Sequence, residues 1–189
     1  DICTPALACE LLVEFEEKGY RVIPTGLQHG TITVHLNGSN YEITTSRRDG
    51  EYSDGRHPDS IEFTSDLIYD LERRDFTMNA MAYNPEEGLI DLFNGFEDIK
   101  HRIIRCVGNP DERFKEDGLR ILRCLRFATQ LGFSVDLPTR RALLNQINFL
   151  DNISSERINS EFCKIVDASA IYKSKRTLNT YAFILCHCI

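Results

Sequence analysis

The chain lacks several features that would assign it to whole classes of protein. It contains no run of eighteen apolar residues, so the sequence predicts no membrane-spanning helix and no membrane partner. It does not open with a basic segment followed by an apolar one, as secretory signals do, and we expect a cytoplasmic protein. Its 189 residues are enough to bury a substantial core, as one large domain or two small ones.

A disulfide framework is not indicated either. The seven cysteines are odd in number and scattered, and most of them lie within apolar runs. This pattern is typical of reduced thiols in the core of a cytosolic protein. Two of the thiols flank a histidine in Cys186-His187-Cys188, but two sulfurs and one histidine without a second cluster make a poor zinc site.

Positive charge is scarce in the first half of the chain. Residues 1–100 hold 8 basic and 20 acidic side chains, whereas residues 101–150 hold 9 basic and 5 acidic ones. An acidic first half argues against a general nucleic-acid-binding surface, which requires a basic stripe. It is compatible with an ordinary acidic surface, and equally with a domain that gathers carboxylates for metal ions ahead of a helical part that meets phosphate.

Local patterns in the first half predict both helices and strands. Thr4-Pro5 is typical of a helix start, and the apolar spacing that follows predicts a helix that stops at Gly19. Residues 31–36 and 41–45 alternate in polarity around Asn37-Gly38, which predicts a β-hairpin.

The next segments predict a loop and then a change to helical structure. Residues 46–59 hold two glycines, a proline and almost no apolar side chain, so we expect a mobile loop there. Apolar residues recur at helical spacing from Pro110 until Gly132, which predicts one helix in that region. Further elements are expected as a strand at residues 61–64 and helices at residues 67–71, 139–147 and 155–166.

Two polar motifs carry the candidate chemistry. Residues 73–80, Arg-Arg-Asp-Phe-Thr-Met-Asn-Ala, contain two guanidiniums, a carboxylate, a hydroxyl and an amide. Residues 116–120, Glu-Asp-Gly-Leu-Arg, place Asp117 and Arg120 one helical turn apart, hence on one helical face. Such groups suit phosphates, a ribose and the edge of a base. On spacing alone, a capped helix start and an ordinary intrahelical ion pair would explain both motifs.

The order of three segments resembles a known family. The strings RRDFTMNA, DLFNGFEDI and ERFKEDGLRILRCLRFATQLGF resemble, in this order, the class II tRNA nucleotidyltransferases, or CCA-adding enzymes, and the related bacterial poly(A) polymerases. The resemblance implies an α/β nucleotidyltransferase head with a small mixed sheet at residues 1–108, then an all-helical neck at residues 109–189. It fades beyond Lys164, and the neck-like segment 155–162 is expected to have a structural role.

The resemblance also implies a magnesium site. Nucleotidyl transfer uses two divalent ions to activate the attacking hydroxyl and to neutralise the triphosphate. Asp1 matches the second aspartate of the family's Asp-x-Asp motif and is the metal ligand expected here; the first aspartate and an upstream Gly-Gly-x-x-Arg segment are absent from this sequence. Glu42 matches the family's third acid, although its place on an alternating strand also fits a solvent-facing carboxylate.

For the nucleotide, the resemblance assigns Arg73, Arg74, Asp75 and Asn79 to ribose, triphosphate and local backbone. Three further residues, Asp117, Arg120 and Arg123, match the base-reading helix of the family.

In that helix, Asp117 is expected to accept from the exocyclic amino group of cytosine or adenine, while Arg120 donates beside it. Uracil and guanine present a carbonyl at that place and are rejected. Arg123 either reinforces Arg120 or contacts phosphate, and Arg126 is a weaker candidate.

The expected reaction is attack by the 3′ hydroxyl of a tRNA on the α-phosphate of CTP or ATP, which adds C and A and releases pyrophosphate. In the family, a loop at residues 46–59 helps to switch the pocket from CTP to ATP, and relatives that add only cytosines lack it. Two alternatives stay open. A poly(A) polymerase with the same pocket would add only A, and a non-catalytic nucleotide- or RNA-binding fragment would show no magnesium-dependent turnover.

Overall fold

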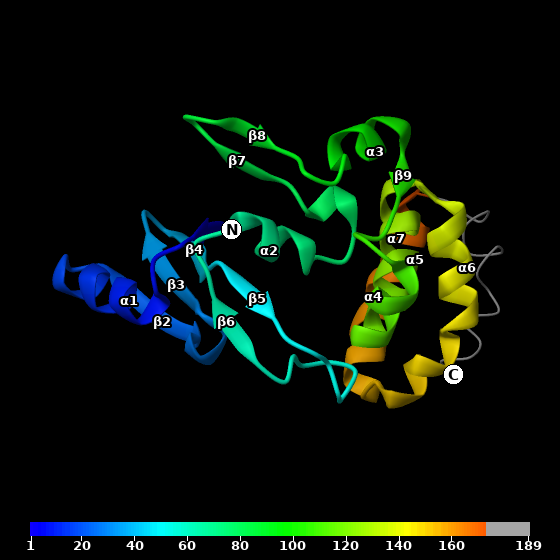
Figure 1. Cartoon of the computed structure of the whole chain (residues 1–189), viewed down its shortest axis with the longest axis horizontal. Coiled ribbons are helices and arrows are strands. Elements are labelled where there is room, and N and C mark those ends of the chain that lie inside the picture. Colours follow the sequence, from blue (N-terminus) through cyan, green and yellow to red (C-terminus); the bar gives the residue numbers. More distant parts are fainter. Residues whose placement is uncertain (173–189) are drawn as a thin grey trace. The chain divides into compact units, whose positions relative to one another are not determined.

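The computed structural model describes residues 1–172, with side chains described through Ala168. Cys186-His187-Cys188, which we judged a poor zinc site, lies outside the described residues. The chain forms two compact units, the first made of Asp1–Glu51 with Pro58–Arg73, the second of Tyr52–His57 with the chain from Arg74 onward (Figure 1). The domain boundary expected at residue 108 stays a prediction.

A four-stranded mixed sheet forms the centre of the first unit. Its order is β1-β4-β3-β2, with β1 parallel to β4 and the other neighbours antiparallel. The predicted hairpin is confirmed, because Asn37 and Gly38 take the positive φ values of 51° and 78° that this turn requires. The strands are β1 (Ile2–Thr4), β2 (Arg21–Gly26), β3 (Thr31–Leu36) and β4 (Ser39–Thr45), and a short 3-10 turn, η1 (Leu27–His29), joins β2 to β3.

Helix α1 (Ala8–Glu17) packs its apolar face on this sheet over a small core. The helix start predicted at Thr4-Pro5 was wrong, because Thr4 is drawn into the sheet, where β1 pairs it with Thr45. The hydroxyl of Thr45 also accepts from the backbone N–H of Ala8 at 2.9 Å, so a strand residue supplies the cap. The core residues are Ala8, Ile32, Val34 and Ile43.

The predicted mobile loop at residues 46–59 begins with a strand. β5 (Arg47–Asp49) pairs with β6 (Ile61–Phe63), and α2 (Leu67–Glu72) follows, capped by Asp66. Arg47 donates to the carbonyl oxygen of His29 at 2.9 Å and forms an ion pair with Asp49, also at 2.9 Å. All three residues of β5 are charged, so the strand lacks the alternation of apolar and polar residues by which strands are recognised in a sequence.

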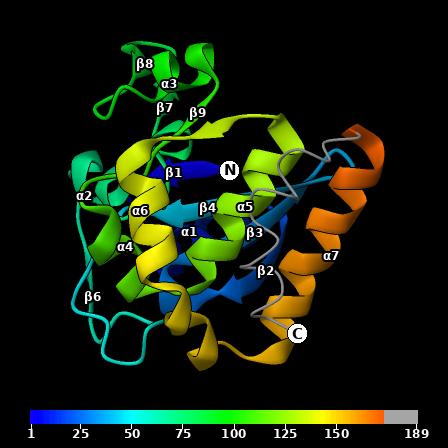
Figure 2. The same cartoon turned by 90° about the vertical axis from the view of Figure 1, so that its right-hand side faces the viewer.

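Helices dominate the second unit. Figure 2 shows α5 beside α7, the two helices that pack most closely in this unit. None of the helices in residues 1–172 is long and apolar enough to cross a bilayer. The elements are η2 (Thr77–Asn79), β7 (Ala82–Asn84), β8 (Gly88–Ile90), α3 (Gly95–His101), β9 (Ile103–Ile104), α4 (Pro110–Glu116), α5 (Leu119–Leu131), β10 (Ser134–Val135), α6 (Leu137–Asn145), η3 (Ile147–Asn152) and α7 (Ser155–Tyr172).

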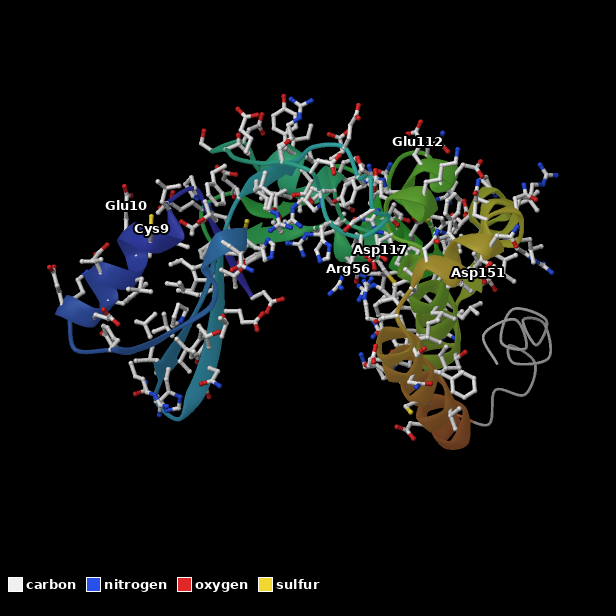
Figure 3. The ribbon with its side chains drawn as sticks, turned by 90° about the horizontal axis from the view of Figure 1, so that it is seen from below. Cys9, Glu10, Arg56, Glu112, Asp117 and Asp151 are labelled. Atoms are coloured by element: carbon white, nitrogen blue, oxygen red, sulfur yellow. The ribbon has the colours of Figure 1, made fainter. Side chains whose placement is uncertain are left out.

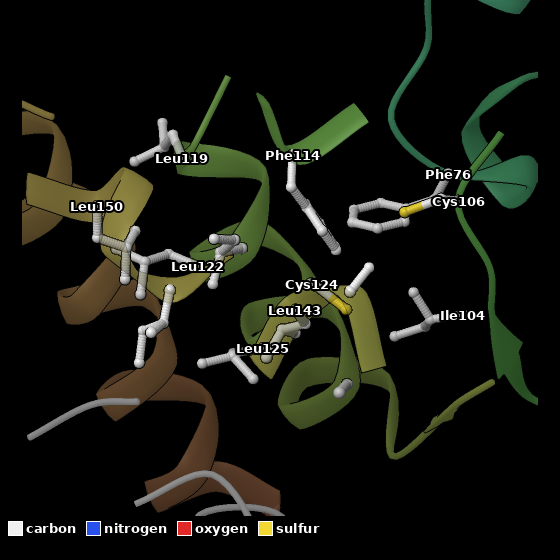
Figure 4. Close-up of a cluster of buried hydrophobic side chains, with 14 of the residues drawn as sticks. Phe76, Ile104, Cys106, Phe114, Leu119, Leu122, Cys124, Leu125, Leu143 and Leu150 are labelled. Carbon is white, nitrogen blue, oxygen red and sulfur yellow. The ribbon is translucent and has the colours of Figure 1, made fainter. Parts of the chain in front are cut away.

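The core of the second unit is much larger than that of the first (Figure 4). Phe114 and Phe76 are fully buried, together with Cys106 and Cys124. Burial raises the pKa of the Cys106 thiol to about 12, so this sulfur stays protonated and unreactive. The five cysteines among the described residues are free, as expected, but the expectation of core thiols was wrong for the exposed Cys3, Cys9 and Cys163.

The single helix predicted between Pro110 and Gly132 is interrupted. Asp117 has an extended backbone (φ −149°, ψ 105°), so α4 and α5 are separate helices. Gly118 follows, and a Cβ there would lie 2.7 Å from the carbonyl oxygen of Phe149. This close approach of two backbones leaves no room for a side chain and fixes the break. The predicted stop at Gly132 is confirmed by its φ of 65°.

Candidate nucleotide-binding site

The two carboxylates expected to bind metal belong to neighbouring strands of the first unit. β1 and β4 are parallel, with Ile2 opposite Ile43 and Cys3 opposite Thr44. Extending this register by one residue places Asp1 beside Glu42. Residues that face each other across a ladder share a face of the sheet, so both acids lie on the face opposite the α1 core. Both are exposed to solvent.

This pair fits magnesium in chemistry but is not a complete cage. Mg²⁺ is commonly held by one or two carboxylates together with water and substrate phosphates. Within residues 1–172 there is no group of three or more His, Cys, Asp or Glu side chains that could hold a metal ion by itself. Asp1 and Glu42 therefore fit a site that substrate oxygens complete.

Arg73, the first residue of the 73–80 motif, is engaged within the first unit. Its guanidinium binds the carboxylate of Asp70 at 2.6 Å and lies 3.9 Å from Asp49. Asp70 and Asp49 are almost completely buried, so Arg73 neutralises two buried acids at the end of α2. Arg74 is half-buried and begins the second unit.

Asp75 is the central residue of the motif. Its side chain is buried and accepts from the backbone N–H of Phe76 and from the amide of Asn79. The guanidinium of Arg123, on α5, contacts the other carboxylate oxygen at 2.7 Å through Nε and 2.6 Å through Nη2. Two guanidinium nitrogens thus share one carboxylate oxygen, and the contact joins two segments forty-eight positions apart and fixes the direction of Arg123.

Of the two roles weighed for Arg123, its observed partner is Asp75 rather than Arg120, and contact with phosphate stays a prediction. About a third of its side chain remains exposed, at 34%. The guanidinium also lies over the ring of Phe127, 5.5 Å from its centroid, which is within the range of a cation–π contact. A half-exposed, oriented guanidinium is the form in which an arginine binds phosphate oxygens.

A second polar network holds the 73–80 motif in place. The hydroxyl of Thr77 donates to Asp98 on α3 at 2.7 Å, and Arg105 binds the same carboxylate at 3.0 Å. The start of α3 packs directly against the motif at Gly95. A Cβ at this position would lie 2.2 Å from the carbonyl oxygen of Thr77, so only glycine allows this close packing. Arg105 also binds Asp136 at 2.8 Å. The motif is therefore anchored by contacts from Asp98 and Gly95, in addition to the contact of Asp75 with Arg123.

Asp117 lies at the break between α4 and α5. Its Oδ1 accepts from the backbone N–H of Leu119 at 3.0 Å and caps α5. Its Oδ2 accepts from Nη2 of Arg157, on α7, at 2.9 Å. The side chain remains 17% exposed, so the carboxylate can still be reached.

The expectation that Asp117 and Arg120 share a helical face was wrong. Asp117 is not helical, and Arg120 binds Glu116 at 2.5 Å and the carbonyl oxygen of Arg113 at 3.1 Å. Glu116 also binds Arg113 at 2.8 Å. The structure nevertheless brings both predicted base-reading residues to the start of α5, each held by an oppositely charged neighbour.

Sequence reasoning missed two of these neighbours, Glu116 and Arg157. Glu116 stands four positions before Arg120, which is the spacing of an ion pair along a helix. This contact could therefore have been predicted from the sequence. Arg157 lies forty positions from Asp117, in a segment with an expected structural role, and no local pattern indicated the contact. Arg126, the weaker candidate, binds the buried Glu161 at 3.1 Å and lies over the ring of Phe127.

The tip of the 46–59 segment forms a compact turn in the second unit. Asp54 accepts from the backbone N–H groups of Arg56 and His57, and its carboxylate contacts the His57 ring at 2.8 Å. The hydrogen bond from His57 lowers the pKa of Asp54 to about 2. A Cβ on Gly55 would lie 3.8 Å from the carbonyl oxygen of Lys115, so the turn reaches the end of α4. Figure 3 accordingly draws Arg56 next to Asp117.

Comparison with known proteins relates this arrangement to RNA-processing enzymes. The sequence model of a family described as "Poly A polymerase head domain" matches residues 1–105. A CCA-adding enzyme of Lactobacillus delbrueckii subsp. bulgaricus is 47% identical over 165 residues, which cover 87% of this chain and 41% of that protein. A CCA-adding enzyme of Staphylococcus saprophyticus is 44% identical over 181 residues, covering 96% and 44%.

Solved structures give the same relation. The Bacillus stearothermophilus CCA-adding enzyme in complex with CTP is 37% identical, with a TM-score of 0.80 over 93% of this chain and 41% of that one. The Thermotoga maritima CCA-adding enzyme complexed with tRNA is 28% identical, with a TM-score of 0.74 over 96% and 41%. The chain spans less than half the length of these relatives. The fold predicted from the sequence, a small mixed sheet with helices and then a helical part, is confirmed.

Proposed function

Because the chain belongs to the poly A polymerase head-domain family, we propose that it is the head and part of the neck of an RNA nucleotidyltransferase that completes tRNA. The reaction would add C and A from CTP and ATP to the 3′ end by in-line displacement of pyrophosphate. The names of the relatives, CCA-adding enzymes, favour this over a poly(A) polymerase. A tRNA substrate and the free thiols support a cytoplasmic location.

One observation carries the proposal: an ion pair joins the first motif to α5, the helix on which the second motif ends. Asp75 from the first motif orients Arg123, three residues after the base-reading candidate Arg120. A phosphate-binding guanidinium and a base-reading site thereby come from one helix, α5. This is the minimum that a protein needs to hold a nucleotide by both its triphosphate and its base.

The residues of the second unit divide the recognition between them. Arg123 and Arg74 are the candidates for triphosphate and ribose, while Asp75 and Asn79 hold the local geometry through their own hydrogen bond of 3.0 Å. Asp117 accepts from the amino group of cytosine or adenine, and Arg120 donates beside it. With protein groups reading the base, the reaction needs no template.

The residues of the first unit supply the chemistry. We assign Mg²⁺ to Asp1 and Glu42, which lie side by side in the sheet register. When bound, the metal activates the attacking hydroxyl and neutralises charge on the triphosphate. Arg73 stays with Asp70 and Asp49 in this unit. We therefore assign it to supporting the motif, with Arg74 as the arginine nearer the substrate.

The proposal is tested by extension of a tRNA that lacks its terminal CCA, with the protein at the length that its gene encodes. Addition of C, C and A followed by a stop, dependent on magnesium, is the expected result. A long ladder of A alone would indicate a poly(A) polymerase instead. Binding of CTP without any extension would leave the non-catalytic alternative.

A further inference from the structure

The carboxylate of Asp117 is held by donors on both of its oxygens. Oδ1 accepts from the backbone N–H of Leu119 at 3.0 Å, and Oδ2 accepts from Nη2 of Arg157 at 2.9 Å. The first contact comes from the start of α5, and the second comes from α7, forty positions later. Two donors from different helices fix the rotation of a side chain that otherwise has two free torsions.

This fixation determines what Asp117 can offer a ligand. An ionised carboxylate has about four acceptor positions and no donor. Each oxygen uses one position on a protein N–H, and the side chain is still 17% exposed. What remains is an acceptor of fixed direction, which suits an amino group and repels a carbonyl. A freely rotating Asp117 would lose this directional preference.

Arg157 is only partly enclosed by the protein. Its Nη2 binds Asp117, but its Nη1 is buried and has no hydrogen-bond acceptor among the residues that the structure describes. A buried donor without an acceptor destabilises the folded state, and the neighbouring Arg126 shares this feature at its Nε. The Arg157 side chain is also 22% exposed, at the same place as the carboxylate that it holds.

A second ion pair between the same two helices provides a comparison. Arg126 on α5 binds Glu161 on α7 at 3.1 Å, one helical turn from Arg157. Glu161 is 4% exposed and has no contact with Asp117 among those described. This pair therefore reports the packing of α5 on α7, separately from the orientation of Asp117.

We propose that Arg157 is a positioning residue that sets base choice. By holding Asp117 as an acceptor of fixed direction, Arg157 makes the site accept cytosine and adenine, which present an amino group to it, and reject uracil and guanine, which present a carbonyl at that place. The inference rests on the proposed function, because it takes Asp117 to be the residue that reads the base.

The test measures equilibrium binding of CTP and UTP to the protein at the length that its gene encodes, so that no turnover is needed. We expect R157A to lose about tenfold of the preference for CTP over UTP, the equivalent of one contact at a base edge. R157K, which keeps the charge and one donor, should restore part of the preference. E161Q is the matched control, with a lower melting temperature and an unchanged CTP-to-UTP ratio.

Different results would overturn different claims. If R157A and R157K weaken the binding of CTP and of UTP by the same factor, Arg157 only holds the helices together. The same conclusion follows if E161Q changes the CTP-to-UTP ratio as much as R157A does. Equal binding of CTP and UTP by the wild type would overturn base reading by Asp117 and this proposal with it. A wild type that prefers CTP but does not extend tRNA would overturn the proposed reaction, while loss of that preference in R157A would still support the role of Arg157.

Discussion

The two compact units hold their candidate site residues in different ways. In the first unit, Asp1 and Glu42 are exposed on a small sheet whose hydrophobic core cluster has four buried residues. In the second, Asp75 and Arg120 are buried beside a core of seventeen residues and bind oppositely charged partners. Exposed acids suit metal ions that arrive with the substrate, whereas paired and buried charges suit recognition that must be rigid before the ligand arrives.

The largest effect should come from breaking the larger core. Phe114 is fully buried, and F114A should lower the free energy of unfolding by about 3–5 kcal/mol. Because the two units have separate cores, amide hydrogen exchange should quicken in α4–α7 and remain unchanged in β1–β4. Equal loss of protection in both units would contradict the division. The matching substitution in the core of the first unit is I32V, which should lower the free energy of unfolding by about 1 kcal/mol.

Removing the tip of the loop should separate the two base choices. The structure places Arg47–Asp49 in a strand, so the deletion is confined to residues 52–57, the part that reaches α4. We expect addition of the final A to fall by on the order of a hundredfold, as for loss of one transition-state contact, while both cytosines are still added. The 3′ ends of the products give the answer, and equal loss of C and A addition would refute the loop's role.

The Asp75–Arg123 pair should matter for both stability and recognition. D75N keeps the shape of the side chain and removes its charge, which leaves Arg123 without its charged partner. Since Arg123 is 34% exposed, we expect a loss of about 1–2 kcal/mol in unfolding free energy, below the range for a fully buried pair. CTP affinity should fall as well. I32V, similarly destabilised but in the first unit, should retain it.

The smallest effect concerns pH. The pKa of Asp54 is lowered from its usual 3.8 to about 2, chiefly by the hydrogen bond from His57. A depressed carboxyl pKa stabilises the folded turn above pH 3.8, and this contribution disappears as the pH falls through 2. Titration of Asp54 by NMR should give the low value, and H57A should return it toward 3.8. An unchanged midpoint in H57A would exclude His57 as the cause.

The elements with strong local patterns were predictable, but contacts between distant segments were not. The hairpin at Asn37-Gly38 and the stop at Gly132 follow from backbone conformations that few residues tolerate. The break at Gly118 could not be foreseen, because it depends on the backbone of Phe149 thirty-one positions away.

The same distinction holds for the candidate site. The family motif identified Asp75 and Asp117, but their partners Arg123 and Arg157 are set by how helices pack. A spacing of one helical turn suggested that Asp117 and Arg120 share a helical face, and the extended backbone at Asp117 excludes this. Sequence patterns thus supplied the candidate residues, while the ion pairs that orient them required the fold.

The most direct test of the account is to sequence the 3′ ends of a tRNA lacking CCA after reaction with all four nucleotides, comparing E42Q with D117A in the protein at the length that its gene encodes. If the first unit carries the chemistry and the second reads the base, E42Q should leave the ends unextended, and D117A should still extend them but with U and G among the added bases. Extension by E42Q at the wild-type rate, or faithful C, C, A ends from D117A, would contradict this division of roles.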